Sequence, residues 1–517
     1  MPSQALSSTN GHCPTPLLTQ SDQVSNSQDL TYFGPTTQPH IQSPSDEPLT
    51  TGGDDDTAPM GFNMDALPLR KALLDLYFRL QTRFQILIDE SLFMTDWASQ
   101  TRSQYYSRFL EDAILAFTAR HSTSSTVRRL RDKYAARCKS QIGAELDDPA
   151  IASLQGLLLL GDVEATRGHA RTGWTYCVIS IGLMVDLGIH VDCTHLVKHG
   201  KLTETEADAR KTLLLSGFVY AAQWSLYLGR PHPISQITLR ATHQAVSEKS
   251  SVWVVFCMRM LDIMDVLNGP VSGSTREPPN RLLELDSELR AFAASVQPPL
   301  SSELIQSGEL DGGLYSFHMQ CCGLQILLHR AILKSDQTRN AEDTISPLSE
   351  STREELYETI TKNATLIAQL ICSYQRIFGV DEIVTVMIDN IFIAAVTLIS
   401  HVHRLNQQGQ HDHPIQWLHF LSNLLQDMEK HFPATLRMRS CLAKMAENSA
   451  LASIFPPVVG SHNSGDIFFP QGEMQMPGLD FSDLLGGVEQ CDFFDMTNTP
   501  GNASLYLGSA WMTPTAV

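Results

Sequence analysis

The sequence lacks any closely spaced group of cysteines. Its ten cysteines are spread from Cys13 to Cys491, and no two of them have the C-x-x-C spacing of a zinc or redox site. This spread is typical of reduced thiols in a cytosolic or nuclear protein. The start of the chain lacks the basic and apolar runs of a secretory signal. We therefore expect no disulfide framework and no metal site built on the cysteines.

A long uninterrupted apolar run is also missing. The most membrane-like stretch is 383–400, and Asp389 and Asn390 lie in its middle. A charge at bilayer depth is costly, so this pattern favours a buried core helix over a membrane span. We expect no membrane partner.

Basic residues are absent from both ends of the chain. Residues 1–60 contain seven acids and residues 445–517 contain eight, and neither stretch has a Lys or Arg. The middle therefore holds all 37 basic residues, and the formal net charge of the whole chain is −19. This balance excludes a protein that binds nucleic acid through a bulk positive charge. With 43% hydrophobic and 18% charged residues, the chain is still rich enough in apolar residues for a globular body.

Motifs of catalysis are missing too. The chain has no phosphate-binding G-x-x-x-x-G-K-[ST], no G-x-G-x-x-G, no H-E-x-x-H and no G-x-S-x-G. Two His-x-His pairs, at 401 and 403 and at 411 and 413, have no cysteine ligand beside them, and a solvated loop is the favoured interpretation of the second pair. We assign no catalytic, cofactor-binding or metal-binding residue and do not expect an enzyme.

Three regions follow from composition and periodicity. Residues 1–64 are rich in Ser, Thr, Gln and Pro and are expected to be disordered, and residues 446–517 are expected to form a disordered acidic and aromatic tail. Between them, 65–445 shows apolar residues at three- and four-residue steps and no strand-like alternation. The fold class is therefore all-α: a multi-helical regulatory domain between two disordered acidic segments.

Helix signals divide this middle region. Thr203 and Glu206 form a capping-box pair, and Gly188 and Gly229 have the character of helix ends. Asp148 is expected to cap a helix that has Pro149 in its first turn. A helix over 167–187 carries an apolar stripe at Trp174, Val178, Ile181 and Val185.

The first helix of the body carries a leucine stripe from Leu69 to Leu87. Such a stripe could serve a dimerising coil, and a homodimer stays an open alternative. Arg83 interrupts the seam, so burial within one chain is the favoured interpretation.

A basic cluster is a candidate nuclear import signal, with Arg128, Arg129, Arg131 and Lys133 as its residues. The alternative is the solvated face of an amphipathic helix whose residues Leu130, Tyr134 and Ala135 turn inward. Short basic matches arise often by chance, so the helix-face interpretation is favoured.

The tail stretch 479–496 reads LDFSDLLGGVEQCDFFDM and interleaves acids with large apolar side chains. Repulsion among the carboxylates keeps the apolar side chains exposed, and such a segment can fold into a groove on a partner. This is the design of an acidic activation segment that would bind transcription machinery or a coactivator. Its apolar residues are Phe481, Leu484, Leu485, Phe493 and Phe494.

Several stretches, in order, resemble the fungal-specific transcription factor domain, the middle homology region of the fungal Zn2Cys6 zinc-cluster regulators. They are DLYF at 75–78, the long string PAIASLQGLLLLGDVEATRGHARTGWTYCVISIGLMVDLGIHVD at 149–192, SLYLGRP at 225–231 and ILLHRAIL at 326–333. The combination of VDCTHLVKHGKL and SLYLGRP is most similar to the nitrogen-assimilation-regulator-like branch.

The resemblance implies an all-helical regulatory domain in a nuclear transcription factor that acts on RNA polymerase II genes of a metabolic or biosynthetic set. The chain departs from the family at its start, because residues 1–130 contain Cys13 alone, whereas the zinc cluster needs six cysteines within about 30 residues. We expect no cofactor in this chain, and zinc only if an N-terminal cluster precedes it. DNA contact would then come from that cluster or from a partner.

Two other interpretations stay open. A chain without its own DNA-binding module could act as an accessory or repressor protein through a DNA-bound partner. A helical ligand-binding protein or enzyme is the third, which the missing motifs disfavour. Target genes, effector and sign of regulation do not follow from the sequence.

Overall fold

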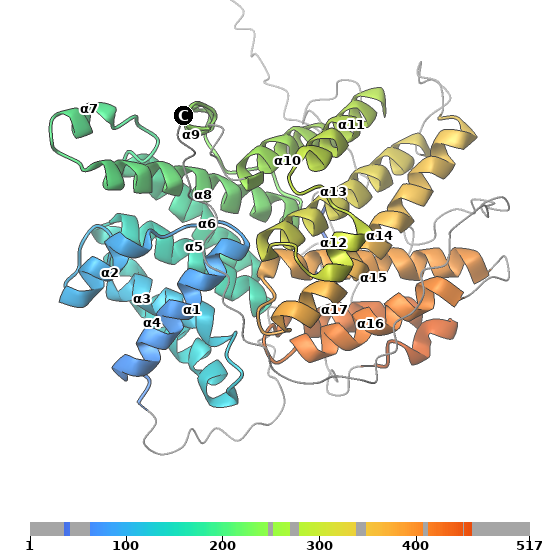
Figure 1. The fold of residues 1–517 in the computed structure, drawn as a ribbon, viewed down its shortest axis with the longest axis horizontal. Coiled ribbons are helices and arrows are strands. Elements are labelled where there is room, and N and C mark those ends of the chain that lie inside the picture. Colours follow the sequence, from blue (N-terminus) through green and yellow to red (C-terminus); the bar gives the residue numbers. More distant parts are fainter. Residues whose placement is uncertain are drawn as a thin grey trace, which may run out of the picture. The chain divides into compact units, whose positions relative to one another are not determined.

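The computed structural model contains helices and no strand in the residues that it describes, which confirms the all-α class (Figure 1). These residues are 36–41, 63–246, 252–268, 279–337, 348–406, 412–447 and 449–457. Most of the predicted disordered segments 1–64 and 446–517 lie outside them.

The first group of helices precedes residue 246. It contains α1 (Leu67–Leu80), α2 (Glu90–Ser99), α3 (Arg108–Ala119), α4 (Ser125–Asp147), α5 (Ile151–Thr166), α6 (Ala170–Asp186), α7 (Thr194–Lys198), α8 (Glu204–Leu228) and α9 (Gln236–Ala245). The second group contains α10 (Val252–Asn268), α11 (Pro279–Ser295), α12 (Ser302–Ser307), α13 (Gly312–Gln337), α14 (Glu350–Phe378), α15 (Thr385–Asn406), α16 (Asp412–Met428) and α17 (Ala434–Ala446). Short 3-10 helices cover Pro39–Ile41, Gln81–Arg83 and Ala450–Ser453.

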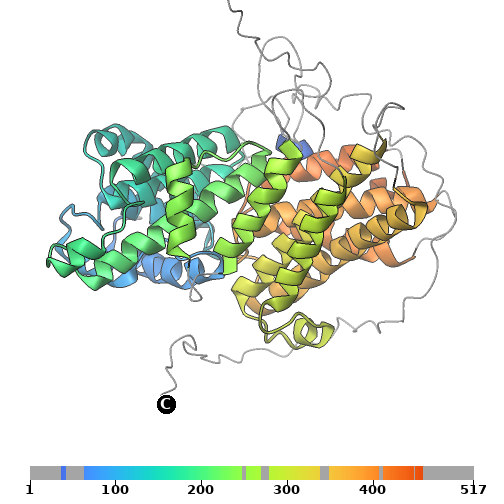
Figure 2. The same ribbon diagram turned by 90° about the horizontal axis from the view of Figure 1, so that it is seen from above.

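Each group is built around one apolar helix. Helix α5 is buried on nearly all sides by α3, α4 and α6, as its leucine-rich sequence requires. Helix α15 lies among α13, α14, α16 and α17. It is the one helix in the described residues long and apolar enough to cross a membrane, yet 72% of its most apolar window is buried inside the protein. Helix α8 packs on both α6 and α10 and so connects the two groups (Figure 2).

Local signals set several helix ends as predicted. The Thr203 hydroxyl accepts from the Glu206 amide at 3.2 Å, and the Thr203 amide donates to the Glu206 carboxylate at 2.8 Å. Gly188 and Gly229 have φ angles of 61° and 63°, the left-handed conformation that glycine adopts without strain. The prediction for Asp148 is wrong. Ala150 is the N-cap of α5, and its amide donates to the Ser153 hydroxyl at 3.0 Å.

The stripe predicted on 167–187 does not mark the buried face of α6. Val178 and Val185 are exposed, and the buried residues are Gly173, Cys177, Ser180, Ile181 and Met184. Helix α6 packs closely on α5 where Gly161 and Gly173 meet, and this contact explains which face of α6 is buried.

The Gly161–Gly173 crossing leaves no room for a side chain. A Cβ at Gly173 would lie 2.6 Å from the Gly161 carbonyl oxygen and 2.5 Å from the Trp224 ring. The carbonyl belongs to a buried helix and cannot move away easily. The small residue, rather than the apolar stripe, therefore decides which face of α6 turns inward.

We expect Gly173→Ala to lower the free energy of unfolding by about 1–3 kcal/mol, because the new methyl group overpacks the crossing. Gly182→Ala, in the same helix, meets no atom within 4 Å and should leave stability unchanged or raise it by up to about 1 kcal/mol. Urea unfolding followed by circular dichroism measures both. Equal stability of the two variants would contradict this account of the crossing.

Candidate functional site

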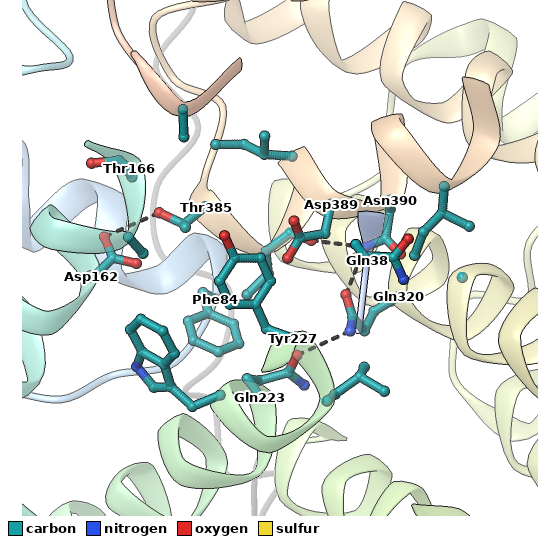
Figure 3. A pocket seen from close by; sticks show the side chains of 18 of the residues that line it. Gln38, Phe84, Asp162, Thr166, Gln223, Tyr227, Gln320, Thr385, Asp389 and Asn390 are labelled. Atoms are coloured by element: carbon teal, nitrogen blue, oxygen red, sulfur yellow. Dashed lines mark hydrogen bonds between the residues drawn. The ribbon is translucent and has the colours of Figure 1, made fainter. Parts of the chain in front are cut away.

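A cavity lies where the two groups of helices meet. Its wall comes from α5, α8, α13, α15 and α17, together with Phe84 and Gln38, and it encloses about 890 Å³, part of it open to solvent. Figure 3 shows Asp162, Thr166 and Thr385 on one side and Asp389, Asn390 and Gln38 on the other.

One side of the cavity rests on a buried ion pair. Arg120, the C-cap of α3, is fully buried, and its Nη1 lies 2.8 Å from Asp162 Oδ2 of α5. The Thr385 hydroxyl at the start of α15 accepts from Arg120 Nη2 at 3.1 Å and donates to Asp162 Oδ2 at 3.1 Å. Burial lowers the pKa of Arg120, and the Asp162 carboxylate counteracts this effect. The pair fixes α3, α5 and α15 to one another.

Two histidines hold the Arg120 residue in place. The Arg120 Nε donates to His121 Nε2 at 3.0 Å, so the protonated nitrogen of His121 is Nδ1, which lies 2.5 Å from the Asp381 carbonyl oxygen. His431 Nδ1 lies 2.6 Å from the Arg120 carbonyl oxygen. Burial and the adjacent Arg120 charge keep the pKa of His121 well below its usual range. The His121 contact needs a neutral imidazole, whereas the His431 contact needs only a proton on Nδ1.

A chain of side-chain amides forms another part of the wall. Asn390 Nδ2 donates to Gln320 Oε1 at 2.6 Å, and Gln320 Nε2 donates to Gln223 Oε1 at 3.0 Å. Gln223 in turn lies with its Nε2 3.5 Å from the Cys257 sulfur. The amides therefore share one direction across α15, α13 and α8. A Cβ on Gly323 would lie 1.9 Å from Asn390 Oδ1, so glycine is required for this approach.

The short segment Thr36–Ile41 closes the cavity beside the amides. Thr36 donates to the Leu226 carbonyl oxygen at 2.9 Å, and Thr37 donates to that of Leu228 at 2.6 Å. These carbonyls belong to the last turn of α8, where the Leu226 oxygen also accepts from the Gly229 amide at 3.3 Å. His40 packs its ring edge-on against Phe392, with centroids 4.6 Å apart. The segment falls inside the range 1–64 that was predicted to be disordered, and these six residues have a defined place.

The described residues that line the cavity include no Ser, Cys, His or Lys. The wall therefore offers hydrogen-bond donors and acceptors, two carboxyl groups and four aromatic rings. Within the described residues, no three His, Cys, Asp or Glu side chains are placed to hold a metal ion. The arrangement is suited to binding.

The cysteines do not fit a zinc cluster. Those in the described residues are free and separate, apart from the neighbours Cys321 and Cys322 of α13. Burial raises the pKa of both thiols, the opposite of what a zinc ligand needs. Cys321 and Cys322 are buried residues of the apolar core.

The basic cluster lies at the start of α4. Arg128 donates to carbonyl oxygens of the preceding loop, and Arg131 pairs with Asp132 at 3.2 Å. Arg129 and Lys133 are exposed. The inward residues predicted for this helix are indeed buried, and the import signal stays a prediction. The activation residues Phe481, Leu484, Leu485, Phe493 and Phe494 lie outside the described residues.

The functional groups of the cavity were missed by sequence reasoning, with one exception. Asp389 and Asn390 were noticed as polar residues inside an apolar run, and this was the available signal. Arg120, Asp162 and Gln320 have no local pattern that separates them from surface residues. They are polar residues at positions that the helix packing turns inward.

The described residues thus form an all-helical body with a cavity between its two groups of helices. Residues 74–261 match the fungal specific transcription factor domain, as the sequence resemblance predicted. The family is one of transcription regulators rather than enzymes.

The relatives agree with this assignment. The chain is 25% identical over 390 residues to nitrogen assimilation transcription factor nirA of Emericella nidulans, covering 68% of this chain and 42% of that protein. It is 32% identical over 174 residues to nitrogen assimilation transcription factor nit-4 of Neurospora crassa, covering 31% and 15%. An uncharacterized transcriptional regulatory protein of Schizosaccharomyces pombe is 23% identical over 341 residues, covering 60% and 53%.

These matches confirm the similarity to nitrogen-assimilation regulators. The chain spans only about half or less of the length of these relatives. No solved structure matches the chain.

The buried ion pair leads to a stability prediction. Asp162→Asn leaves the Arg120 charge buried without a counter-ion, so we expect the free energy of unfolding to fall by about 3–5 kcal/mol. The control is Asp148→Asn, which removes a carboxylate that is 82% exposed and pairs with Arg102 at 2.7 Å. We expect this change to cost less than about 1 kcal/mol. Thermal and urea unfolding would measure both, and similar losses would contradict the role given to the Arg120–Asp162 pair.

Proposed function

We propose that the chain is a fungal nuclear transcription factor that regulates RNA polymerase II transcription of a metabolic or biosynthetic gene set. The observation that carries the proposal is the transcription factor domain over 74–261. The names of the nitrogen-assimilation relatives favour a metabolic gene set. Nuclear entry would use the basic cluster of α4, of which Arg129 and Lys133 are exposed.

In this proposal the helical body receives a signal and the tail transmits it. The tail stretch 479–496 carries the acids and aromatic residues that can bind a groove on a coactivator or on the transcription machinery. A change in the body would hide or free this stretch. The route is docking between surfaces, which agrees with a cavity suited to binding.

DNA contact would come from outside the described body. The body carries a small net charge, so it has no surplus of positive charge that would bind DNA. Residues 1–130 contain one cysteine and so cannot form a six-cysteine zinc cluster. A zinc cluster that precedes residue 1, or a DNA-bound partner, would supply the DNA contact. The cysteine content favours a second candidate of the same class: an accessory or repressor protein that acts through a DNA-bound partner.

A reporter assay tests the activating role of the tail. We expect residues 465–517, fused to a foreign DNA-binding module, to activate a reporter gene, and Phe493→Ala with Phe494→Ala to remove most of this activity. Leu505→Ala with Leu507→Ala is the control, because these apolar residues lie outside the acidic stretch. An inactive wild-type fusion, or full activity of the Phe493 and Phe494 double variant, would count against an activation segment.

A pull-down from fungal nuclear extract separates the two candidates. The accessory candidate predicts that the full chain captures a zinc-cluster protein and binds promoter DNA only in its presence. If the chain is an autonomous factor, it should bind promoter DNA without a partner once a six-cysteine zinc-cluster module is joined to it. Electrophoretic mobility shifts with each preparation measure the difference.

A further inference from the structure

The cavity has an unbalanced charge. Two carboxyl groups, those of Asp162 and Asp389, belong to its described wall, and no Lys, Arg or His does. The charge of Asp162 is compensated by Arg120, which is not part of the wall. Asp389 has no such counter-ion among the described residues, where the basic group that approaches it is His40, with its Nε2 at 3.9 Å. Burial, with a smaller contribution from the Arg437 charge, lowers the pKa of His40 to about 3, so His40 is neutral.

The Asp389 side chain remains accessible from the cavity. It is 25% exposed, whereas the His40 side chain beside it is 4% exposed. Both ring nitrogens of His40 lack a hydrogen-bond partner, which is rare for a buried polar group. Arg437 donates to the Gly168 carbonyl oxygen at 2.9 Å and is not part of the wall. No basic side chain of the described wall therefore compensates the Asp389 carboxylate, and a cation bound beside it would favour its ionised form.

Aromatic rings surround the same space. Phe84, Tyr220, Trp224 and Tyr227 all line the cavity, and the Trp224 and Tyr227 rings lie 5.7 Å apart at an angle of 66°. The faces of aromatic rings attract cations. A carboxylate without a counter-ion next to such rings is complementary to a positively charged organic group and repels an anion.

We propose that this cavity binds a small organic cation whose ammonium or amidinium group contacts the Asp389 carboxylate. The aromatic rings hold the apolar part of the ligand, and the amide chain that ends at Asn390 offers additional hydrogen bonds (Figure 3). Gln38 forms part of the wall, so a bound ligand is covered by the segment Thr36–Ile41. The ligand supplies the positive charge that the protein itself does not place beside Asp389.

Binding can be measured whether or not the chain regulates transcription. The role of the cation as the signal rests on the proposed function. Binding by the purified full chain and activation in the reporter assay are separate measurements, so failure of one is distinguishable from failure of the other.

Three probes that share one carbon skeleton test the charge preference. They are 3,3-dimethylbutylamine, 3,3-dimethylbutan-1-ol and 3,3-dimethylbutanoate, which are positive, neutral and negative at neutral pH. We expect millimolar amine to raise the melting temperature of the full chain and the alcohol and carboxylate to have little effect, since a ligand that binds the native state stabilises it. Titration calorimetry would then give the affinities.

Asp389→Asn removes the charge and keeps the shape of the side chain. We expect it to lower the affinity for the amine about tenfold or more, because charge-assisted hydrogen bonds are the stronger ones. Asp427→Asn, an exposed aspartate of α16, is the control and should bind the amine as the wild type does. Melting without ligand would verify that both variants fold.

Two results would overturn the proposal. One is a wild-type chain that the amine stabilises no more than the alcohol or the carboxylate of the same skeleton. This comparison needs no variant, so it stays decisive if Asp389→Asn fails to fold. The other is a folded Asp389→Asn variant that binds the amine as tightly as the wild type.

Discussion

The Arg120–Asp162 pair is the contact on which the meeting of the two helix groups depends. Arg120 ends α3, Asp162 lies in α5, and Thr385 at the start of α15 bonds to both. A buried charge without a partner is far more costly than a pair, so these three helices must meet in one register. The ring of Phe117 lies 4.1 Å from the guanidinium and that of Phe432 lies 5.3 Å from it, so the fully buried Arg120 is shielded from water.

Much of the fold follows from local sequence. Helix ends are set by residues close together in the sequence. The capping box at Thr203 and the left-handed glycines at 188 and 229 therefore predicted helix ends that the structure contains. The face of α6 could not be predicted in the same way. Apolar spacing favoured Val178 and Val185, but the approach of α5 is decided by Gly173, which has no side chain to count in an apolar pattern.

The site was much less predictable than the fold. Its polar residues come from helices that are far apart in the sequence, with Asp162 and Thr385 separated by 223 positions, and only the packing of those helices brings them together. The one local signal was the pair of polar residues Asp389 and Asn390 within an apolar run. This pair indicated a polar contact inside the core, but the sequence does not show which residues make that contact. Arg230 shows the same limit. No local pattern indicates its neighbour, and the structure places its guanidinium 5.7 Å from the centroid of the Trp174 ring.

The other buried acids of the body show why Asp389 stands apart. Burial alone would raise the pKa of Glu164, but the hydrogen bond from His169 and the charges of Arg167 and Lys139 lower it to about 2. Glu111 is likewise held by Arg70 at 2.5 Å. Such acids are structural, since their charges are compensated within the protein.

Asp389 also points inward, but it has none of their compensation, and burial raises its pKa well above the usual range. A protein that places arginine or lysine beside its other inward acids leaves this one facing an aromatic cavity. The difference separates a carboxylate that holds helices together from one that is available to a ligand. In a body of packed helices, that availability is the property that a signal could use.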